Sequence, residues 1–137
     1  MRESTDMKEL IGRKISSLWI NNDQSVLVFG TDSGVVGYET DSECCSKTWF
    51  ADILGVGAML GGTVACVEEV SMGGYNVNNG RCRDGYDKVY GYKLFTDKGC
   101  ATIVFRNSSN GCYGGWITLL RGGMPQGLSS ITEDWQA

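Results

Sequence analysis

Apolar and polar residues alternate along most of this chain, which is the period of a β-strand with one buried face. Seven segments rich in Val, Ile, Tyr, Phe and Thr carry the pattern: residues 14–20, 25–30, 34–40, 63–71, 88–95, 99–106 and 116–120. Short runs of Asn, Asp, Thr and Gly separate several of them, as at 21–23, 31–34 and 96–99, and supply residues that tolerate a positive φ. The pattern predicts a series of antiparallel hairpins.

One stretch follows a helical period instead. Thr48 is a suitable N-cap, and the apolar residues after it have helical spacing: Trp49, Phe50, Ile53, Leu54 and Met59. We therefore predict one helix over 48–60. Shorter helical turns are predicted at 8–11 and at 130–133, where the serine and the glutamate have the spacing of a capping box.

Three landmarks recur in the same order in the two halves of the chain. The string LIGRKISSL at 10–18 corresponds to MLGGTVACV at 59–67, and the Thr-Asp-x-Gly turn at 31–34 corresponds to the one at 96–99. Cys45 precedes Trp49 by four residues, as Cys112 precedes Trp116. The common order favours an internal duplication over coincidence.

These patterns predict a β-rich α+β fold, built from two pseudo-repeated antiparallel β-β-β units with one short helix between them. Each unit has one apolar face to cover, so we expect either a two-layer arrangement or a half-open barrel. The length of 137 residues fits one domain, 1–137. Within it we expect a first repeat with its helix at 8–58, a second repeat at 59–120 and a C-terminal tail at 121–137.

The composition excludes several classes of function. Histidine is absent, so a single chain cannot build a Ser-His-Asp or Cys-His nucleophile or a zinc site with a histidine ligand. Twelve Lys and Arg against sixteen Asp and Glu give a net charge of −4, and the basic residues are scattered, so we do not expect nucleic-acid binding. No apolar run approaches the roughly 18 residues of a membrane span, and the first residues lack the apolar centre of a signal peptide. We expect no membrane association and a cytoplasmic location.

The six cysteines are expected to be reduced thiols in such a location. They form no C-x-x-C pair, so we expect neither a metal site nor a cofactor. Cys44, Cys45 and Ser46 stand directly before the predicted helix. A thiol there has a lowered pKa and can act as a nucleophile or a redox sensor. The alternative, favoured by the absence of a histidine base, is a buried turn in which Cys45 packs and Ser46 or Thr48 caps the helix.

Other candidate sites are rich in hydrogen-bonding groups. The string NSSNGCYGG at 107–115 is either a binding turn or a polar hairpin loop. The glycine- and asparagine-rich loop at 73–87 is expected to be mobile, and its two arginines either meet an anionic ligand or are solvated. In a pseudo-twofold arrangement, the turns at 41–47 and 107–115 with Trp49 and Trp116 frame one cleft or two related ones. The ligand-binding candidates are Cys44, Cys45, Ser46, Trp49, Asp52, Arg81, Arg83, Asn107, Ser108, Ser109, Asn110, Tyr113 and Trp116.

The strings MKELIGRKI, CCSKTWFADI and FRNSSNGCYGGWI resemble a family of small proteins of tailed bacteriophages and prophages. The resemblance covers residues 7–120, and its most specific marker is C-C-S-x-x-W-F with the Asn-Ser-Ser-Asn-Gly turn downstream. The family has no agreed activity. The resemblance therefore implies a phage origin and a setting in the host cytoplasm, without assigning a reaction.

Three hypotheses for function follow. The first is a non-enzymatic phage accessory protein that binds a host protein or a small anionic, nucleotide-type ligand, with host defence evasion as one role. The second is a virion structural or assembly component, for which spare sheet edges and a homo-oligomer are suited. The third is an enzyme that uses Cys45 or acidic residues; we do not expect an enzyme, because no motif for phosphate loops, dinucleotides or two-metal catalysis is present.

Overall fold

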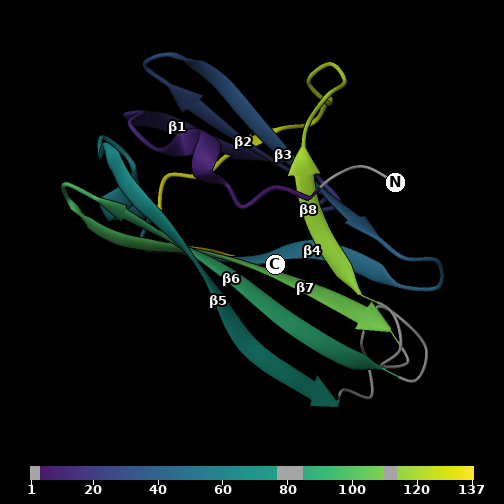
Figure 1. The fold of residues 1–137 in the computed structure, drawn as a ribbon. Coiled ribbons are helices and arrows are strands. Elements are labelled where there is room, and N and C mark those ends of the chain that lie inside the picture. Colours follow the sequence, from purple (N-terminus) through teal and green to yellow (C-terminus); the bar gives the residue numbers. More distant parts are fainter. Residues whose placement is uncertain (1–3, 77–84, 110–113) are drawn as a thin grey trace.

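The computed structural model describes residues 4–76, 85–109 and 114–137. These residues form two five-stranded antiparallel sheets that lie as two layers (Figure 1). The first sheet has the order β8-β3-β2-β1-β9 and consists of β1 (Ile15–Ile20), β2 (Val26–Thr31), β3 (Gly34–Ser42), β8 (Gly115–Leu119) and β9 (Ser129–Ser130). The second has the order β10-β4-β7-β6-β5 and consists of β4 (Lys47–Leu54), β5 (Val64–Asn76), β6 (Tyr86–Thr96), β7 (Gly99–Ser109) and β10 (Trp135–Gln136).

The predicted β-rich class is confirmed, with a single α-helix in the described part of the chain, the short α1 (Val56–Met59). The sheets do not close into a barrel, so the two-layer alternative holds. The N-terminal helical turn is also present, as the 3-10 helix η1 (Lys8–Leu10). No helix within the described ranges is long and apolar enough to cross a membrane.

The chain exchanges strands between the two sheets. Strands β1, β2 and β3 follow one another in the first sheet, and the chain then crosses to β4 in the second. Strands β5, β6 and β7 follow one another in the second sheet, and the chain then crosses back to β8 in the first. Each crossing strand pairs with the third strand of the other group, β4 with β7 and β8 with β3. This exchange ties the two layers together covalently at both crossings.

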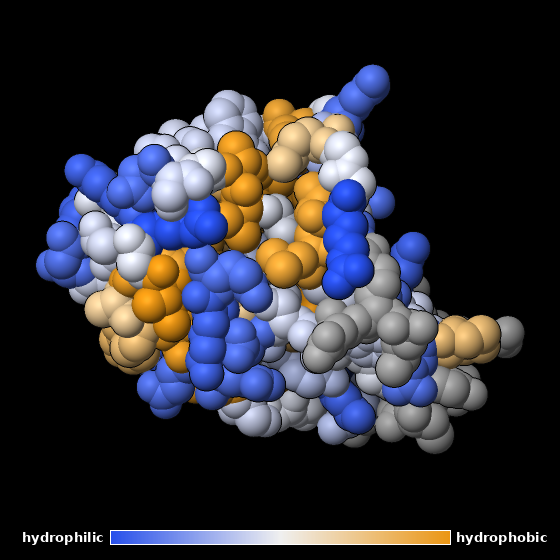
Figure 2. Space-filling model, turned by 45° about the horizontal axis from the view of Figure 1, so that its top comes forward, coloured by the Kyte–Doolittle hydropathy of each residue, from blue (hydrophilic) through white to orange (hydrophobic). Residues whose placement is uncertain are grey.

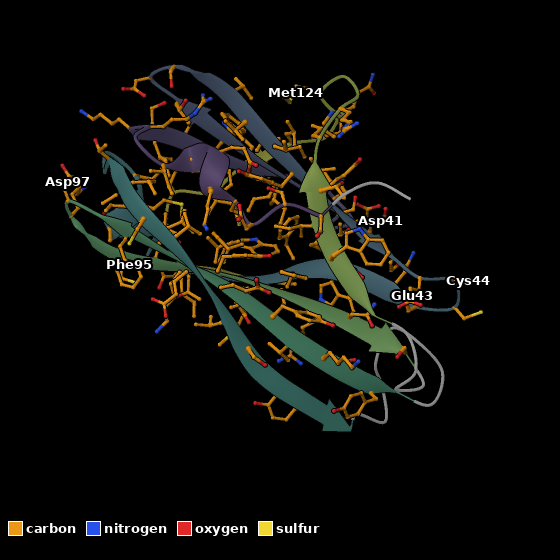
Figure 3. The ribbon with its side chains drawn as sticks, in the orientation of Figure 1. Asp41, Glu43, Cys44, Phe95, Asp97 and Met124 are labelled. Atoms are coloured by element: carbon orange, nitrogen blue, oxygen red, sulfur yellow. The ribbon has the colours of Figure 1, made fainter. Side chains whose placement is uncertain are left out.

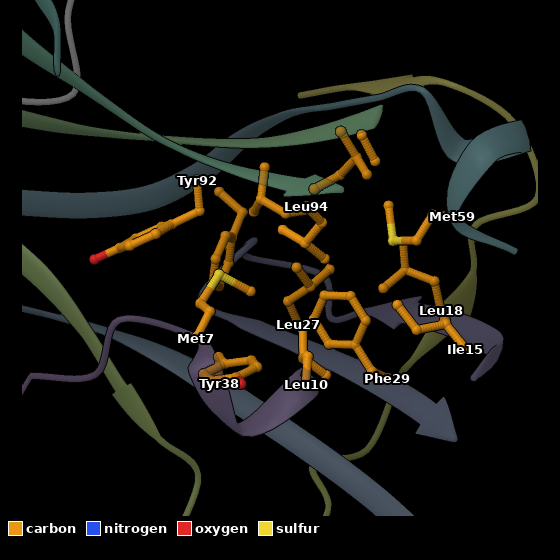
Figure 4. Close-up of a cluster of buried hydrophobic side chains, with 14 of the residues drawn as sticks. Met7, Leu10, Ile15, Leu18, Leu27, Phe29, Tyr38, Met59, Tyr92 and Leu94 are labelled. Carbon is orange, nitrogen blue, oxygen red and sulfur yellow. The ribbon is translucent and has the colours of Figure 1, made fainter. Parts of the chain in front are cut away.

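A hydrophobic core lies between the layers, with contributions from both sheets (Figure 4). Its largest fully buried side chains include Phe29 and Tyr38 of the first sheet and Phe50 and Leu94 of the second. Phe29 and Tyr38 pack edge to face, with ring centroids 5.8 Å apart. Burial of each such side chain contributes about 1.5–3 kcal/mol, so the shared core is the main source of cohesion between the sheets.

The two Thr-Asp-x-Gly turns make corresponding hydrogen bonds. The Lys14 N–H donates to Asp32 Oδ1 at 3.0 Å, and the Thr63 N–H donates to Asp97 Oδ1 at 2.8 Å. The residue after the Asp donates its N–H to the threonine hydroxyl of the turn, Ser33 to Thr31 Oγ1 at 3.3 Å and Lys98 to Thr96 Oγ1 at 3.1 Å. Gly34 and Gly99 at the ends of the turns have φ values of 116° and 142°, which only glycine adopts readily. Each turn is thereby fixed to the start of its own group of strands.

The backbones that lead into β1 and β5 also meet each other. Ile15 N–H donates to Gly62 O at 3.0 Å and Val64 N–H donates to Arg13 O at 3.0 Å, around a β-bridge between Lys14 and Thr63. A bulge follows in both strands, between Ile15 and Ser17 in β1 and at the equivalent place in β5. The two groups of strands therefore start from one shared junction.

Two helix predictions are wrong. Residues 47–54 form strand β4, and only Val56–Met59 of the predicted helix 48–60 is helical. Phe50 and Ile53 belong to the core, whereas Trp49 lies in a separate small cluster. A bulge between Phe50 and Asp52 interrupts the alternation and places core residues three apart, which imitates a helical period.

The C-terminal segment is not a helical tail. Residues 129–130 form β9 on β1, and residues 135–136 form β10 on β4, so this segment adds a strand to each sheet. Ile131 between them is buried in the core. The capping-box spacing at 130–133 predicted a helical turn wrongly, because pairing with two existing sheet edges takes precedence over this local signal.

Candidate functional site

A pocket of about 540 Å³ opens between the layers, where the N-terminal segment meets β8 and the inner face of β5, β6 and β7. The N-terminal segment is held there because the Thr5 N–H donates to Ile117 O at 3.0 Å, which places it along β8. The lining residues come from five parts of the chain: Ser4, Thr5, Asp6, Glu9, Glu69, Tyr90, Tyr92, Phe105, Gly115, Trp116, Leu119 and Arg121. The volume lies within the range of about 300–1,000 Å³ that is typical of small-ligand sites.

Three aromatic rings of β6 and β7 form one wall of the pocket. The Phe105 ring lies 4.8 Å from the Tyr90 ring and 6.0 Å from the Tyr92 ring between centroids, and both pairs are inclined by 14°. Strand alternation explains this arrangement, because Tyr90 and Tyr92 are two residues apart and share a face. Phe105 is the register partner of Tyr90 on the neighbouring strand. The three rings are stacked nearly parallel to one another; Phe105 and Tyr92 are almost fully buried, and Tyr90 is half-buried.

Three carboxylates surround this wall, those of Asp6, Glu9 and Glu69. Glu9 is fixed in place, because its Oε1 accepts hydrogen bonds from Thr5 Oγ1 at 2.7 Å and from Tyr38 Oη at 2.9 Å. Glu69 lies on β5 as the register partner of Tyr92. The one basic residue in the lining is Arg121. The pocket is therefore acidic as well as aromatic.

The pKa of Tyr92 is raised by burial, and the charges of these carboxylates contribute to the increase. Burial is the main cause that raises it, to about 12, and the charges of Glu69, Asp6 and Glu9 raise it further. Burial and the hydrogen bond with Glu9 likewise raise the pKa of Tyr38 far above its usual value. Both hydroxyls therefore stay protonated at neutral pH, and all three carboxylates act at the Tyr92 hydroxyl.

Trp116 is the candidate residue from the sequence that the structure places in this pocket. Its Nε1 is buried and has no hydrogen-bond partner among the described residues. The lining of the pocket thus includes a half-buried indole beside the carboxylates.

The other candidates of the first half lie elsewhere. Cys44 and Cys45 are exposed in the turn between β3 and β4, and Asp52 is half-buried in β4. Trp49 is buried with Ala51, Val89 and Val104 in the small cluster and does not line the pocket. Of the two arrangements expected from the sequence, one cleft shared by Trp49 and Trp116 is therefore wrong, and two related ones stay a prediction. The expected helix start beside the thiols is also wrong, because residues 47–54 form β4 and α1 begins at Val56.

The predicted binding turn at 107–115 is also different. Asn107, Ser108 and Ser109 are buried residues of β7 rather than a loop. Asn107 Nδ2 donates to Ser46 Oγ at 3.1 Å and to Thr48 Oγ1 at 3.0 Å, and so joins β7 to the turn at 43–46. The two polar segments do meet, as expected from the sequence, but as a packed contact rather than as the walls of a cleft.

The remaining candidates, Arg81, Arg83, Asn110 and Tyr113, lie outside the described residues. The loop predicted at 73–87 is shorter than expected at both ends, because β5 extends to Asn76 and β6 begins at Tyr86. Among the residues placed in the structure, no group of three or more Cys, Asp or Glu side chains is arranged to hold a metal ion.

Sequence reasoning missed most of the pocket. Glu69 lies on the same face of β5 as the half-buried Val67, although its own side chain is exposed, and Tyr90 and Tyr92 share one face of β6. Both signals were readable in the sequence. The contribution of the N-terminal segment had no such signal, because it depends on where residues 4–9 pack.

On the side of the molecule shown in Figure 2, apolar side chains are exposed between hydrophilic ones. Exposed large apolar residues of the described chain include Ile11, Trp19 and Val35 of the first half. Val35 also lines a smaller pocket of about 350 Å³ that adjoins the first, since both contain Glu9, Leu119 and Arg121.

The fold and this site define a class: a two-layer antiparallel β-protein with an acidic, aromatic pocket between its layers. The chain belongs to the family described as "Domain of unknown function (DUF7448)", whose profile matches residues 8–119. The matched range contains the pocket residues from Glu9 to Leu119 and leaves out the first three and Arg121. Comparisons with curated proteins and with solved structures give no match.

Proposed function

We propose that the protein is a non-enzymatic binding protein whose pocket takes a cationic group, such as an alkylated ammonium or a guanidinium carried on an apolar body. The observation that carries this proposal is the combination in one pocket of three carboxylates with a wall of three aromatic rings. Carboxylates attract the positive charge, the half-buried ring of Tyr90 adds a cation–π attraction, and the stacked aromatic wall shields the apolar body from water.

The charges in the pocket lining determine which sign of ligand charge is favoured there. The lining holds three carboxylates and one arginine, and Lys8 Nζ lies 3.6 Å from Asp6 Oδ2, so the excess of negative charge that would repel an anion comes mainly from Glu9 and Glu69. Burial is the main cause of the raised pKa of Tyr92, and the charges of the same three carboxylates raise it further, which supports a negative potential at the Tyr92 hydroxyl. The anionic ligand expected from Arg81 and Arg83 stays a prediction for another part of the chain.

The proposal of binding without catalysis rests on the protonation of the pocket groups. Tyr92, with its pKa raised to about 12, is neither a base nor a nucleophile at neutral pH. Glu9 is occupied by two hydroxyl donors, Thr5 and Tyr38, which suits a fixed electrostatic role. These groups orient and attract a ligand, and none is poised to transfer a proton to it.

Calorimetric titration with benzyltrimethylammonium and with benzoate tests the proposal. The cation is expected to bind and the anion is not. Glu69→Gln is expected to weaken binding about tenfold, which corresponds to 1.4 kcal/mol. Glu68→Gln is the matched control, because the neighbouring side chain of a strand points to the opposite face and should leave affinity unchanged. Equal binding of benzoate, or equal effects of the two substitutions, contradicts the proposal.

We also propose that the chain is an internal duplication of one four-stranded unit, β1–β4 and β5–β8. Support comes from the corresponding hydrogen bonds of Asp32 and Asp97, the reciprocal backbone bonds around Lys14 and Thr63, and the exchange of β4 and β8. In this arrangement the fourth strand of each unit pairs with the third strand of the other unit, so neither unit is complete without its partner. Separate expression of residues 1–54 and 55–137 tests this consequence. Neither half should fold alone, and the mixture should reconstitute the fold.

The phage origin, the setting in the host cytoplasm and a role in host defence evasion stay predictions, as does the alternative of a virion component. Strand β5 is the last strand of its sheet in the described structure, and its 13 residues offer a long edge that suits self-association. Mass measurement of the native protein distinguishes a monomer from the predicted homo-oligomer.

A further inference from the structure

The turn between β3 and β4 brings two thiols together at the surface. Cys44 Sγ and Cys45 Sγ are 3.4 Å apart, and both side chains are exposed. Figure 3 shows Cys44 at the tip of this turn, directed away from the body of the protein. No function proposed above uses these residues.

Backbone conformation explains why the two sulfurs meet. Neighbouring residues of an extended strand direct their side chains to opposite faces. Cys45 departs from that geometry with a φ of 69°, a left-handed conformation that is unfavourable for a non-glycine residue. The departure places both sulfurs on one side of the turn. A strained residue at an exposed tip is a reason to look for a function there.

The ends of the turn are held while its tip is left accessible. Ser46 Oγ donates to Glu43 O at 2.8 Å, and Ser42 Oγ donates to Ser46 O at 3.3 Å. Glu43 also bonds Gly114 in both directions, through its N–H to Gly114 O and through its Oε1 to the Gly114 N–H, each at 3.1 Å. With both ends fixed, the thiols stay near each other, and reaction of one makes the second an intramolecular reactant.

We propose that Cys44 and Cys45 form a dithiol modification site, which low-molecular-weight disulfides oxidise reversibly to a disulfide between the two neighbouring residues. The thiolate of one cysteine attacks the reagent R–S–S–R, forms a mixed disulfide and releases one thiolate RS⁻. The thiolate of the other cysteine then attacks the protein sulfur of that mixed disulfide and releases the second RS⁻. Two cysteine thiols lose two protons and two electrons in total, and the reagent disulfide is reduced to two thiols.

The product is suited to a reversible modification rather than to a structural cross-link. Neighbouring Cα atoms are about 3.8 Å apart across a trans peptide, which is shorter than the roughly 4.4–6.8 Å usual for a disulfide. A disulfide between neighbours is therefore strained, and strained exposed disulfides are easily reduced. Cys66 on β5 and Cys100 on β7 are also exposed, but neither has a cysteine next to it in the sequence.

The test treats the native protein with oxidised glutathione and locates the products by intact-mass measurement and peptide mapping. The wild-type pair should lose two hydrogen atoms and keep no glutathione, whereas Cys44→Ser and Cys45→Ser should each keep one glutathione on the remaining thiol. Cys66→Ser and Cys100→Ser are matched controls that should leave the closure unchanged. Reduction by dithiothreitol should restore the original mass.

A second measurement uses phenylarsine oxide, a trivalent arsenical that binds two neighbouring thiols, and needs no oxidation. One equivalent should be captured at this turn, and capture should be lost in either single variant of the pair. Glutathione retained on both cysteines of the wild type overturns the proposal. So does a disulfide from either of them to Cys82 or Cys112, or arsenical capture that survives Cys44→Ser.

Discussion

The two groups of consecutive strands, β1–β3 and β5–β7, begin alike and end differently. Both start at the shared junction, contain a bulge after the first residue, and turn through an Asp that accepts a backbone N–H. Strands β1, β2 and β3 have 6, 6 and 9 residues, whereas β5, β6 and β7 have 13, 11 and 11. The second group therefore extends well beyond the point where the first one ends.

The extra length is what builds the pocket wall. In the first group, Ser25 and Thr40 lie as far from their turn as Tyr90 and Phe105 lie from theirs, and the Thr40 N–H donates to Ser25 O at 2.8 Å where the hairpin ends. In the second group the same places hold stacked rings. Ile20, the counterpart of Glu69, is a core residue. Similar beginnings thus give a packed end in one group and one wall of the pocket in the other.

The largest effect is expected at the core positions that the two groups have in common. Phe29→Ala should lower the free energy of unfolding by about 3–5 kcal/mol, and Leu94→Ala by about 2–5 kcal/mol, because each leaves a cavity among fully buried side chains. Both variants should unfold in one transition, since one core joins the sheets. Urea unfolding followed by tryptophan fluorescence and by circular dichroism measures this. Two separate transitions would show that the layers are independent.

A substitution in the pocket wall should reduce binding but lower stability less than a substitution in the core. Tyr90→Ser installs the residue found at the corresponding place in the first group, and it should reduce binding of benzyltrimethylammonium about tenfold, or 1.4 kcal/mol, by removal of one ring face. Stability should change less than in the core variants, because Tyr90 is only half-buried. Titration calorimetry measures the effect on affinity, and thermal unfolding measures the effect on stability as a control. Undiminished affinity would show that the Tyr90 ring does not contact the ligand.

Substitutions in the two Thr-Asp-x-Gly turns are expected to lower stability by a smaller amount that is the same for both turns. Asp32→Ala and Asp97→Ala each remove one acceptor of a backbone N–H, and each should lower stability by about 1 kcal/mol. Asp23→Ala is a useful comparison, because that carboxylate bonds only within its local turn, through Ser25. If one of the two turn variants were neutral and the other strongly destabilised, the turns would not be equivalent.

The smallest effect is electrostatic. Glu69→Gln removes a negative charge that helps to raise the pKa of Tyr92, so that pKa should fall from about 12 towards 10 by a fraction of a unit. Because the folded-state pKa is raised, the contribution of Tyr92 to stability is complete below pH 10 and is lost as the pH rises through about 12. Titration of ¹³Cζ-labelled tyrosine by NMR, assigned with Tyr92→Phe, measures the shift. Glu68→Gln should leave it unchanged.

Alternation along the strands and the chemistry of the turns were sufficient to predict seven of the strands and the meeting of the two polar segments. They were not sufficient for β4, where the bulge near Ala51 gave Trp49, Phe50 and Ile53 a helical spacing. Local signals cannot report such a bulge, because it is defined by the register with a partner strand. The short strands β9 and β10 were missed for the same reason.

The site was less predictable than the fold. Residues 107–109 have the composition of a loop, yet they are buried because β7 extends beneath the turn at 43–46. Trp49 and Trp116 have equivalent sequence positions, but Trp49 packs against Val89 and Val104 while Trp116 borders the pocket. Equal sequence landmarks therefore did not imply equal surroundings, because Val89 and Val104 correspond to the polar Gln24 and Glu39 in the first group.

The most direct test of the account is a chemical-shift map of the native protein titrated with benzyltrimethylammonium and, separately, with benzoate. The account predicts that the cation alone perturbs a continuous set of resonances, centred on Glu69, Tyr90, Phe105 and the indole N–H of Trp116. Ser25 and Thr40, at the corresponding place of the first group, should not respond. A map in which benzoate moves the pocket resonances, or in which the cation acts only outside them, would contradict it.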